Sequence, residues 1–287
     1  DYASKYLVEF NFGYNGSERL AAGQRFEFFP AVSAGWVASS EKFWEPISKY
    51  INHFKIRGSY GLVGSDAFAS GAPHFLYQNN IGIGSAHKFW TGLPTSEISK
   101  QGPGFYVLAV QDAGWEHVKK FDIGFDMMLF NQLNITFDYF HDKRERILMS
   151  RASWPSMLGY WGSKPWSNIG EVENQGFELS LNWTKQFGKD LTLDLRGNFT
   201  YNQNEYKYVD EPSYPYVWQT NTGKPLNTVK GYIAEGLFAS EEEIANSPDQ
   251  SQLGANIMPG DIKYRDINGD GQITTCLLYT SPSPRDY

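Results

Sequence analysis

Apolar and polar residues alternate along unusually long runs of this chain, and this pattern constrains the fold more than any other feature. Successive side chains of a β-strand point to opposite faces, so alternation separates an apolar face from a polar one. In YLVEFNFGYN (residues 6–15), Phe10 and Tyr14 share an apolar face. Glu9 and Asn11 lie on the other face. The pattern recurs at 120–130, 133–140, 177–183 and 191–202, and more weakly at 30–36 and 54–61.

The alternating runs are long enough to cross a lipid bilayer. A tilted transmembrane strand needs about 9–11 residues, whereas strands of soluble proteins most often have about 5–6. The apolar faces tend to end in Tyr or Trp, which is typical of membrane interfaces. A mean hydropathy of -0.47 agrees with this, because only alternate residues of such strands face lipid. We therefore predict an all-β protein with an antiparallel transmembrane β-barrel. A soluble β-sandwich also alternates and is the alternative.

Short and long connections alternate between the predicted strands. The links FNQ (130–132) and QFGKD (186–190) are short. The link between residues 39 and 52 is longer, and its sequence EKFWEPISKYI is compatible with a helical turn. The other links are long and cover residues 64–116, 145–170 and the chain from 204 onward. Outer-membrane barrels have short periplasmic turns and long outer loops, so this rhythm favours the barrel.

Composition argues against several other classes of protein. The net charge is -7 and no basic face is present, so we predict no nucleic-acid partner. No apolar run approaches the roughly 20 residues of a membrane helix. The five histidines are dispersed, and the GIGSAH stretch has His87 where a dinucleotide loop needs its third glycine. We therefore predict that the protein is not an enzyme.

The stretch DINGDGQI (266–273) matches the first half of a calcium-binding loop. Such loops place oxygen ligands at positions 1, 3, 5 and 7 and a sharp glycine turn at position 6, here Gly271. The candidate ligands are Asp266, Asn268, Asp270 and, through its carbonyl, Gln272. Position 12, where a bidentate Glu belongs, is Leu277. Two interpretations stay open: a Ca²⁺ site in this loop, or a metal-free turn. In both interpretations the protein requires no cofactor, and Ca²⁺ is only a candidate ligand of this loop.

A long predicted loop is rich in tryptophan. The stretch SWPSMLGYWGSKPW (153–166) contains Trp154, Trp161 and Trp166. Aromatic rings in a loop can stack on sugar rings, but they also hold loops together or lie at a membrane interface. Packing is the commoner role, and the three tryptophans are retained as candidate substrate-binding residues.

The last residues differ in character from the rest of the chain. CLLYTSPSPRD (276–286) is identical to the translation of a transposase sequencing adaptor, and it contains the only cysteine. We therefore predict that residues 1–275 are part of a barrel and that residues 276–287 are a non-native tail. The chain begins at Asp1 without Met, directly before a strand-like run. This leads us to expect an internal fragment of a longer gene.

Six phrases occur along the chain in a recognisable order. They are FFPAVSAGW (28–36), FKIRGSYGLVGSD (54–66), WEHVKKFDIGFDMMLF (115–130), NIGEVENQGFELSLNW (168–183), GYIAEGLF (231–238) and GDIKYRDINGDGQI (260–273). Together they resemble the SusC/RagA family of TonB-linked outer-membrane transporters. The resemblance spans essentially all of residues 1–275.

The resemblance implies part of a 22-stranded, plugged barrel in the outer membrane of Bacteroidetes-type bacteria, in contact with lipid. Family members import glycans or peptides, with energy from a TonB complex that binds near the N-terminus. A SusD-like surface lipoprotein covers their outer loops as a lid. On this basis Trp154, Trp161 and Trp166 are expected to contact the ligand or the lid. The alternatives are a secreted or surface β-sandwich that binds carbohydrate and a calcium-dependent adhesion protein.

Overall fold

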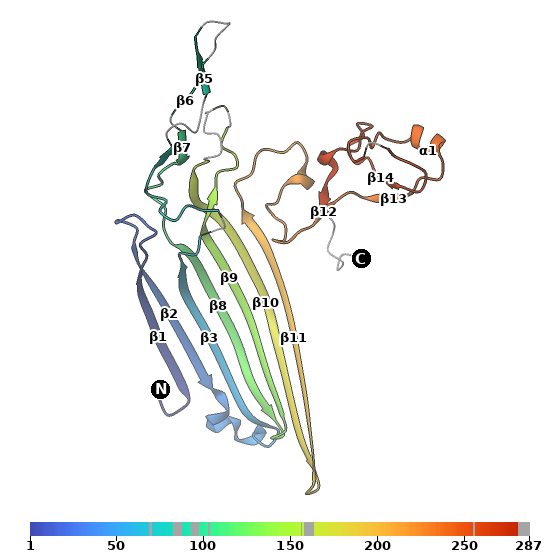
Figure 1. The fold of residues 1–287 in the computed structure, drawn as a ribbon. Helices are drawn as coiled ribbons and strands as arrows, with labels where there is room; N and C mark the ends of the chain where they lie inside the picture. Colours follow the sequence, from blue (N-terminus) through green and yellow to red (C-terminus); the bar gives the residue numbers. More distant parts are fainter. Residues whose placement is uncertain are drawn as a thin grey trace. The chain divides into compact units, whose positions relative to one another are not determined.

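A single antiparallel sheet of seven strands dominates the first part of the chain (Figure 1). The strand order is β1-β2-β3-β8-β9-β10-β11, so each strand pairs with its neighbour along the meander. The strands are β1 Tyr6–Gly16, β2 Phe26–Val37, β3 Ile51–Ser65, β8 Glu116–Leu129, β9 Leu133–Ser150, β10 Trp166–Phe187 and β11 Leu191–Tyr208. This computed structural model describes residues 1–68, 71–82, 88–92, 98–102, 104–155, 157, 164–254 and 256–280.

The strand register keeps the apolar side chains together on one face of the sheet. Phe125 of β8 pairs with Ile56 of β3 and with Phe137 of β9. A ladder of aromatic rings crosses five strands at centroid separations of 5.9, 5.5, 6.0 and 5.8 Å, through Phe54, Phe125, Phe137, Phe177 and Tyr201. Phe10 and Phe12 on the same face are 76% and 77% exposed. An exposed aromatic surface of this extent marks a contact with lipid or protein.

The apolar face has the height expected of a membrane-spanning band. On β11 it runs from Leu191 to Tyr201, which at about 3.4 Å per residue is about 34 Å along the strand. At a tilt of about 40° this gives a height of about 26 Å, near the ~25 Å of outer-membrane barrels. Beyond this band the same face becomes polar, with Gln203 and Glu205 on β11. The strands therefore continue past the apolar band.

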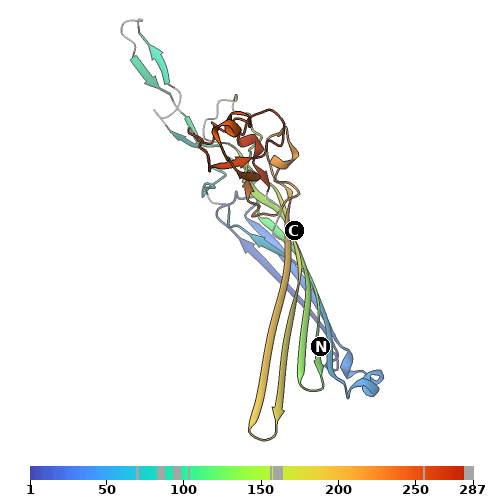
Figure 2. The ribbon, with the colours of Figure 1, turned by 90° about the vertical axis from the view of Figure 1, so that its right-hand side faces the viewer.

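The connections differ between the two ends of the sheet (Figure 2). At one end β8 joins β9 through a turn with Phe130 and Asn131 at φ of 54°, and β10 joins β11 through Gly188 at φ of 68°. The link from β2 to β3 contains two 3-10 helices, η1 Ala38–Ser40 and η2 Lys42–Ile47. The expected helical turn is thus confirmed, in 3-10 form.

The connections at the opposite end are long and carry their own small elements. Between β3 and β8 lie two short two-stranded ribbons, one of β4 Asn80–Gly82 with β7 Gly104–Val107 and one of β5 Lys88–Thr91 with β6 Ile98–Gln101. The link from β9 to β10 begins after Ser150 and ends before Trp166, so the range predicted from the sequence, 145–170, was too long. The prediction missed these strand ends because the regular alternation of polar and apolar residues breaks down there, as in HDKRER (141–146) of β9.

The seven-stranded sheet forms a single layer in Figures 1 and 2, with β1 and β11 as its two edges. A β-sandwich needs a second sheet packed against the first. Among the described residues the remaining strands form only two-stranded ribbons. This arrangement favours the barrel over the sandwich. No helix in the described part of the chain has the length and apolar character to span a membrane.

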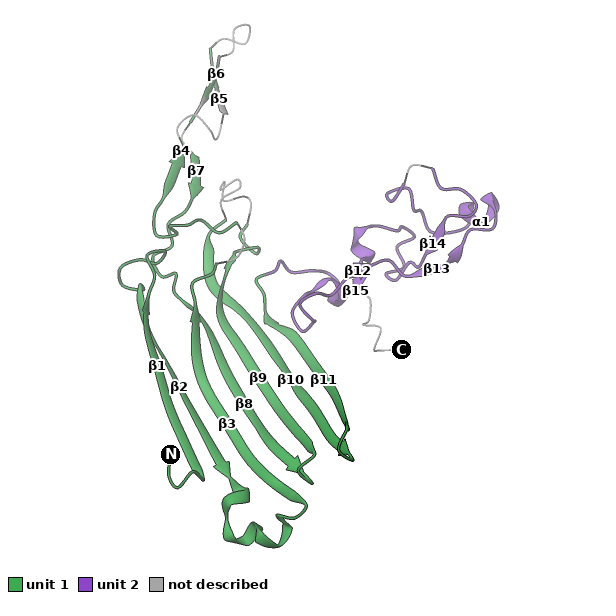
Figure 3. Ribbon diagram, turned by 60° about the horizontal axis from the view of Figure 1, so that its bottom comes forward, with its two compact units in different colours: residues 1–210 green, residues 211–287 purple. Residues whose placement is uncertain are grey.

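Residues 211–287 form a second compact unit (Figure 3). Its elements are η4 Val217–Gln219, β12 Lys230–Gly231, β13 Ala234–Leu237, α1 Glu241–Ala245, β14 Ile262–Tyr264, η5 Thr275–Leu277 and β15 Tyr279–Thr280. The side chain of Ser240 caps α1 by accepting from the Glu243 N–H at 3.2 Å. Three acidic residues, Glu241, Glu242 and Glu243, form the first turn of this helix.

Candidate functional site

The polar face of the sheet carries a cluster of charges centred on Arg57 of β3. Its Nη2 lies 2.7 Å from the carboxylate of Asp138 on β9. Its Nε lies 3.3 Å from Asp126, and its Nη1 lies 3.6 Å from Asp122, both on β8. One guanidinium therefore faces three carboxylates, and the cluster keeps a net negative charge.

Glycine at position 124 allows Arg57 and Asp138 to meet across the strand between them. Gly124 of β8 pairs with Arg57 on one side and with Asp138 on the other. A methyl group at position 124 would overlap the Asp138 carboxylate and the main-chain oxygen of Phe137. Because a main-chain atom cannot move aside easily, only glycine fits here without a shift of the strands.

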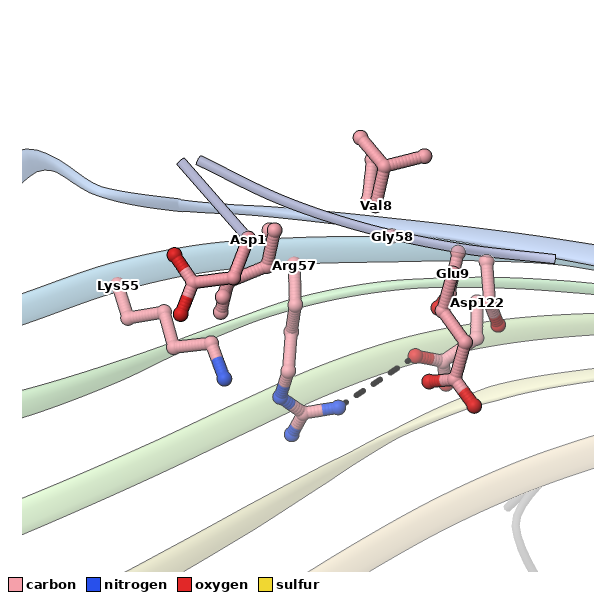
Figure 4. Close-up of a pocket in the computed structure, with 12 residues that line it drawn as sticks. Asp1, Val8, Glu9, Lys55, Arg57, Gly58 and Asp122 are labelled. Atoms are coloured by element: carbon pink, nitrogen blue, oxygen red, sulfur yellow. Dashed lines mark ion pairs between the residues drawn. The ribbon is translucent and has the colours of Figure 1, made fainter. Parts of the chain in front are cut away.

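A groove of about 480 Å³ borders this cluster, and its lining includes Asp1, Glu9, Lys55, Arg57 and Asp122. Figure 4 shows these five side chains on one side of the sheet and Val8 pointing to the other side. The separation of faces predicted from the sequence is thus confirmed at this point. A surface lined by both signs of charge suits a hydrated lumen that contacts polar ligands or protein.

The tryptophan-rich loop is tied to the end of β11 by Asp210. The Asp210 carboxylate accepts hydrogen bonds from the Ser153 N–H at 2.9 Å and the Ser153 hydroxyl at 2.8 Å. It also lies 3.4 Å from Nε of Arg151. Burial favours the neutral acid, but the Ser153 hydrogen bonds and the charge of Arg151 outweigh it and lower the pKa of Asp210.

The structure places two of the three candidate tryptophans, and it places them in different surroundings. Trp154 is half-buried in the turn after Arg151, whose carbonyl accepts from the Trp154 N–H at 3.3 Å. Trp166 begins β10 and packs against the buried cluster of Leu76, Ala113 and Leu148. Trp161 lies outside the described residues. Trp166 thus has a packing contact, and the substrate role of the three remains a prediction.

The DINGDGQI loop is folded around the Asp266 carboxylate. This carboxylate accepts from the N–H groups of Asn268 at 3.2 Å, Gly269 at 2.8 Å and Gly271 at 2.8 Å. Gly269 and Gly271 have φ of 75° and 78°, which glycine adopts without strain. Burial opposes ionisation, but the three N–H donors outweigh it, so the pKa of Asp266 is lowered.

The remaining candidate ligands lie around the same loop. Asn268 donates to the Asp270 carboxylate at 2.8 Å and to the Tyr216 hydroxyl at 3.1 Å. Asp270 also accepts from the Gln272 N–H at 2.8 Å. The side-chain oxygens are of the hard type that Ca²⁺ prefers. In the part of the chain that the structure describes, no three His, Cys, Asp or Glu residues gather as a metal site. Calcium binding therefore stays a prediction.

Sequence reasoning missed the Arg57 cluster and the Asp210 anchor. The charged residues of β3, β8 and β9 were visible as the polar half of the alternation. Their pairing depends on the register of three strands, which a single sequence does not reveal. Asp210 and Ser153 come from separate loops, and no pattern in the sequence links them.

Comparison with known proteins decides the family. Residues 4–261 match the family model described as TonB dependent receptor-like, beta-barrel. The chain belongs to this family. The predicted resemblance and the predicted all-β transmembrane barrel are both confirmed. TonB-dependent receptors are a family of receptors and transporters and not a class of enzymes.

Individual relatives agree with this assignment. The chain is 28% identical over 300 residues to TonB-dependent receptor P3 of Formosa agariphila, covering 99% of the chain and 28% of that protein. It is 26% identical over 302 residues to TonB-dependent receptor SusC of Bacteroides thetaiotaomicron, covering 98% of the chain and 27% of that protein. The chain thus spans little more than a quarter of these relatives.

Solved structures show the same fold. The RagAB peptide importer in its open-open state superposes with a TM-score of 0.69, at 17% identity, over 96% of this chain and 27% of the importer chain. The closed-closed state gives a TM-score of 0.65 at the same identity. The seven-stranded sheet therefore corresponds to part of a larger receptor barrel.

Proposed function

We propose that this TonB-dependent receptor chain forms part of an outer-membrane transporter that imports glycans or peptides. The observation that carries the proposal is the two-faced sheet. One face presents a continuous aromatic ladder, and the other presents the Arg57 cluster. An apolar face toward lipid and a hydrated, charged face toward a lumen are what a transport barrel requires.

The partners follow from the same family. A TonB complex would supply the energy through a segment near the N-terminus of the whole protein, and a SusD-like surface lipoprotein would cover the outer loops. The similarity to SusC and to the RagAB peptide importer supports this assembly and a glycan or peptide substrate. The proposed process is movement of a ligand and involves no bond chemistry in this chain.

Each part of the chain has a role in this mechanism. The long loops between β3 and β8 and between β9 and β10 would capture the ligand together with the lid. The tryptophan-rich loop, held by Asp210, is the proposed ligand or lid contact through Trp154, Trp161 and Trp166. The charged face of β3, β8 and β9 would line the path around a plug.

Uptake by living cells tests the proposal. A strain that lacks the complete gene is compared with one that carries it, using fluorescently labelled oligosaccharides and peptides with and without a protonophore. We expect gene-dependent uptake that the protonophore abolishes, together with co-purification of a SusD-like lipoprotein. Uptake that does not depend on the gene or on energy would contradict the proposal.

The tryptophan contact needs its own variants, because Trp166 packs against a buried cluster. The double variant Trp154→Ala/Trp161→Ala is expected to weaken binding of the ligand or lid while the barrel stays folded. Trp183→Phe, on the apolar face of β10 and outside the loop, serves as the matched control. Unchanged binding by the double variant would reject these two residues as contacts.

A further inference from the structure

The segment between β2 and β3 places its aromatic side chains on the apolar face of the sheet. Trp44 of η2 stacks on Phe54 of β3 with ring centroids 5.2 Å apart and planes inclined by 8°. Phe54 begins the aromatic ladder that crosses the sheet to β11. The indole N–H of Trp44 donates to the carbonyl of Ile51 at 3.0 Å, which fixes the ring in place. The segment thus extends the apolar face at the end with short turns (Figure 2).

The same segment exposes further apolar side chains beside this stack. Phe43 is 62% exposed and lies 6.2 Å from Trp36, a neighbour on the apolar face of β2. Tyr50 is 56% exposed and packs edge to face on the exposed ring of Phe130, at 6.1 Å and 86°. Ile47 is exposed as well. We call Phe43, Ile47, Tyr50 and Phe130 the turn patch. Removing apolar side chains of this kind from water is favourable, so the patch suits an apolar partner.

The charges around the turn patch point to one kind of partner. Glu41 is already paired, because it lies 3.0 Å from Nζ of Lys5 and accepts from the Tyr6 hydroxyl at 2.8 Å. Lys42 and Lys49 are exposed on either side of the patch, and Glu45 is exposed between them. With Glu41 paired to Lys5, the segment keeps two lysines against one further acid. Aromatic rings with flanking lysines are typical of protein segments at the headgroup level of a bilayer. Lysines near such a surface are attracted to anionic lipid.

We propose that residues 38–50 form an interfacial anchor in the periplasmic leaflet of the outer membrane. Phe43, Ile47 and Tyr50 would enter the boundary between headgroups and acyl chains, and Lys42 and Lys49 would contact lipid phosphates. The occupant of the turn patch is therefore phospholipid, because the patch continues the lipid-facing surface through Trp36 and Phe54. The proposal rests on the outer-membrane location proposed above. The other two short turns consist only of FNQ and QFGKD and contain no helix.

Depth-dependent quenching tests the anchor in the complete transporter. The protein, in a cysteine-free background, is placed in nanodiscs of phosphatidylethanolamine and phosphatidylglycerol and labelled with bimane at a single cysteine. The variants are Phe43→Cys in the turn patch, Val8→Cys on the apolar face of β1 and Lys189→Cys in the exposed β10–β11 turn. Quenchers are aqueous iodide and lipids with a nitroxide near the headgroup or at the end of the acyl chain.

We expect the label at position 43 to be quenched several-fold more by the shallow nitroxide than by iodide. The label at position 189 should show the reverse order. If the label at 43 behaves like the one at 189 while the label at 8 is quenched by the deep nitroxide, the turn lies in water and only the anchor is rejected. A protein partner for the patch would then be the better hypothesis. If the label at 8 is not quenched by lipid, the proposed membrane location itself fails.

The lysine contacts have a separate readout. Replacing phosphatidylglycerol with neutral phosphatidylcholine should reduce shallow quenching at position 43. In a Lys42→Gln/Lys49→Gln background this lipid dependence should disappear. Equal lipid dependence with and without the two lysines would reject the phosphate contact.

Discussion

Arg57 on β3 forms its shortest ion pair, 2.7 Å, with Asp138 on β9, although β8 lies between the two strands. The pair is possible because residue 124, which lies between them in the register, is glycine. The side chains are only partly exposed, at 33% for Arg57 and 18% for Asp138. An ion pair with limited exposure and several partners holds its geometry better than an isolated surface pair. On the polar face, ion pairs of Arg57 thus connect the three central strands, in addition to the main-chain hydrogen bonds of the sheet.

The first prediction concerns Gly124. The variant Gly124→Ala should lower the free energy of unfolding by about 1–3 kcal/mol, because the new methyl group overlaps a main-chain oxygen and the Asp138 carboxylate. The measurement is urea-induced unfolding of the complete protein in lipid vesicles. Gly197→Ala on β11 is the matched control, because nothing lies within 4 Å of the added methyl there. Equal effects of the two substitutions would contradict the steric argument.

A double-mutant cycle separates the two overlaps. Asp138→Ala removes the carboxylate but leaves the main-chain oxygen of Phe137 in place. Gly124→Ala should therefore cost less in the Asp138→Ala background, with a coupling of about 1 kcal/mol. Strict additivity would show that the alanine methyl does not disturb the ion pair.

The second prediction is a pH dependence of the tryptophan-rich loop. The pKa of Asp210 is lower in the folded protein than in the unfolded chain, because the hydrogen bonds from Ser153 and the charge of Arg151 favour the carboxylate. The resulting stabilisation is complete above the ordinary Asp value of about 3.9 and is lost as the pH falls through the lower folded value. The protection of the Ser153 amide from hydrogen exchange, measured relative to an unstructured chain at the same pH, should therefore fall below about pH 4.

The matched variant of this prediction is Asp210→Asn. It should accelerate exchange at Ser153 already at neutral pH and flatten the acid dependence, because no carboxylate remains to be protonated. Asp190→Asn in the exposed β10–β11 turn is the control. It should change neither the exchange of the Ser153 amide at neutral pH nor its acid dependence. An unaltered acid profile in the Asp210 variant would assign the effect to another group.

The sequence predicted the seven long strands but not their full length. Alternation survives only where one face meets lipid, so it ends near Tyr139 on β9. The strand itself continues through His141, Lys143 and Glu145 on the same face. The two-stranded ribbons β4–β7 and β5–β6 were not predicted, because their strands of three or four residues are too short for a periodic pattern.

The candidate site was less accessible to sequence reasoning than the fold. The DINGDGQI loop is local, so its turn was visible from its own residues. The contact between Arg57 and Asp138 depends on two strand registers and on the absence of a side chain at Gly124. A hydrogen bond between two loops, such as that from Ser153 to Asp210, leaves no periodic pattern in the sequence.

The third prediction concerns Trp166. Because this residue packs on the cluster of Leu76, Ala113 and Leu148, Trp166→Ala should lower the free energy of unfolding by about 2–3 kcal/mol. Trp154→Ala should have a smaller effect, because Trp154 is half-buried in a turn and does not pack on this cluster. Unfolding in urea measures both. A larger loss for the Trp154 variant would show that the loop, and not the cluster, depends on tryptophan.

The last prediction tests the calcium loop with terbium, a luminescent substitute for Ca²⁺. Tyr216 bonds to Asn268 of the loop and stacks on Trp218 with ring centroids 4.5 Å apart, so aromatic excitation lies close enough to sensitise a bound ion. Asp266 is ready to bind a cation at neutral pH, because its lowered pKa keeps it ionised. We expect sensitised luminescence from the complete protein that excess Ca²⁺ displaces.

Substitutions decide whether that luminescence comes from this loop. Asp266→Asn and Asp270→Asn each remove a charged ligand and should weaken terbium binding by about tenfold or more, equivalent to about 1.4 kcal/mol. Asp261→Asn is the matched control, since its carboxylate accepts from the Met258 N–H outside the loop. If the Asp266 and Asp261 variants bind terbium equally well, the ion is held elsewhere and the loop is a metal-free turn. If only the Asp266 and Asp270 variants lose binding, the loop holds the ion. The Asp266 carboxylate can then ligate it without losing its hydrogen bonds, because it has about four acceptor sites and accepts from three N–H groups.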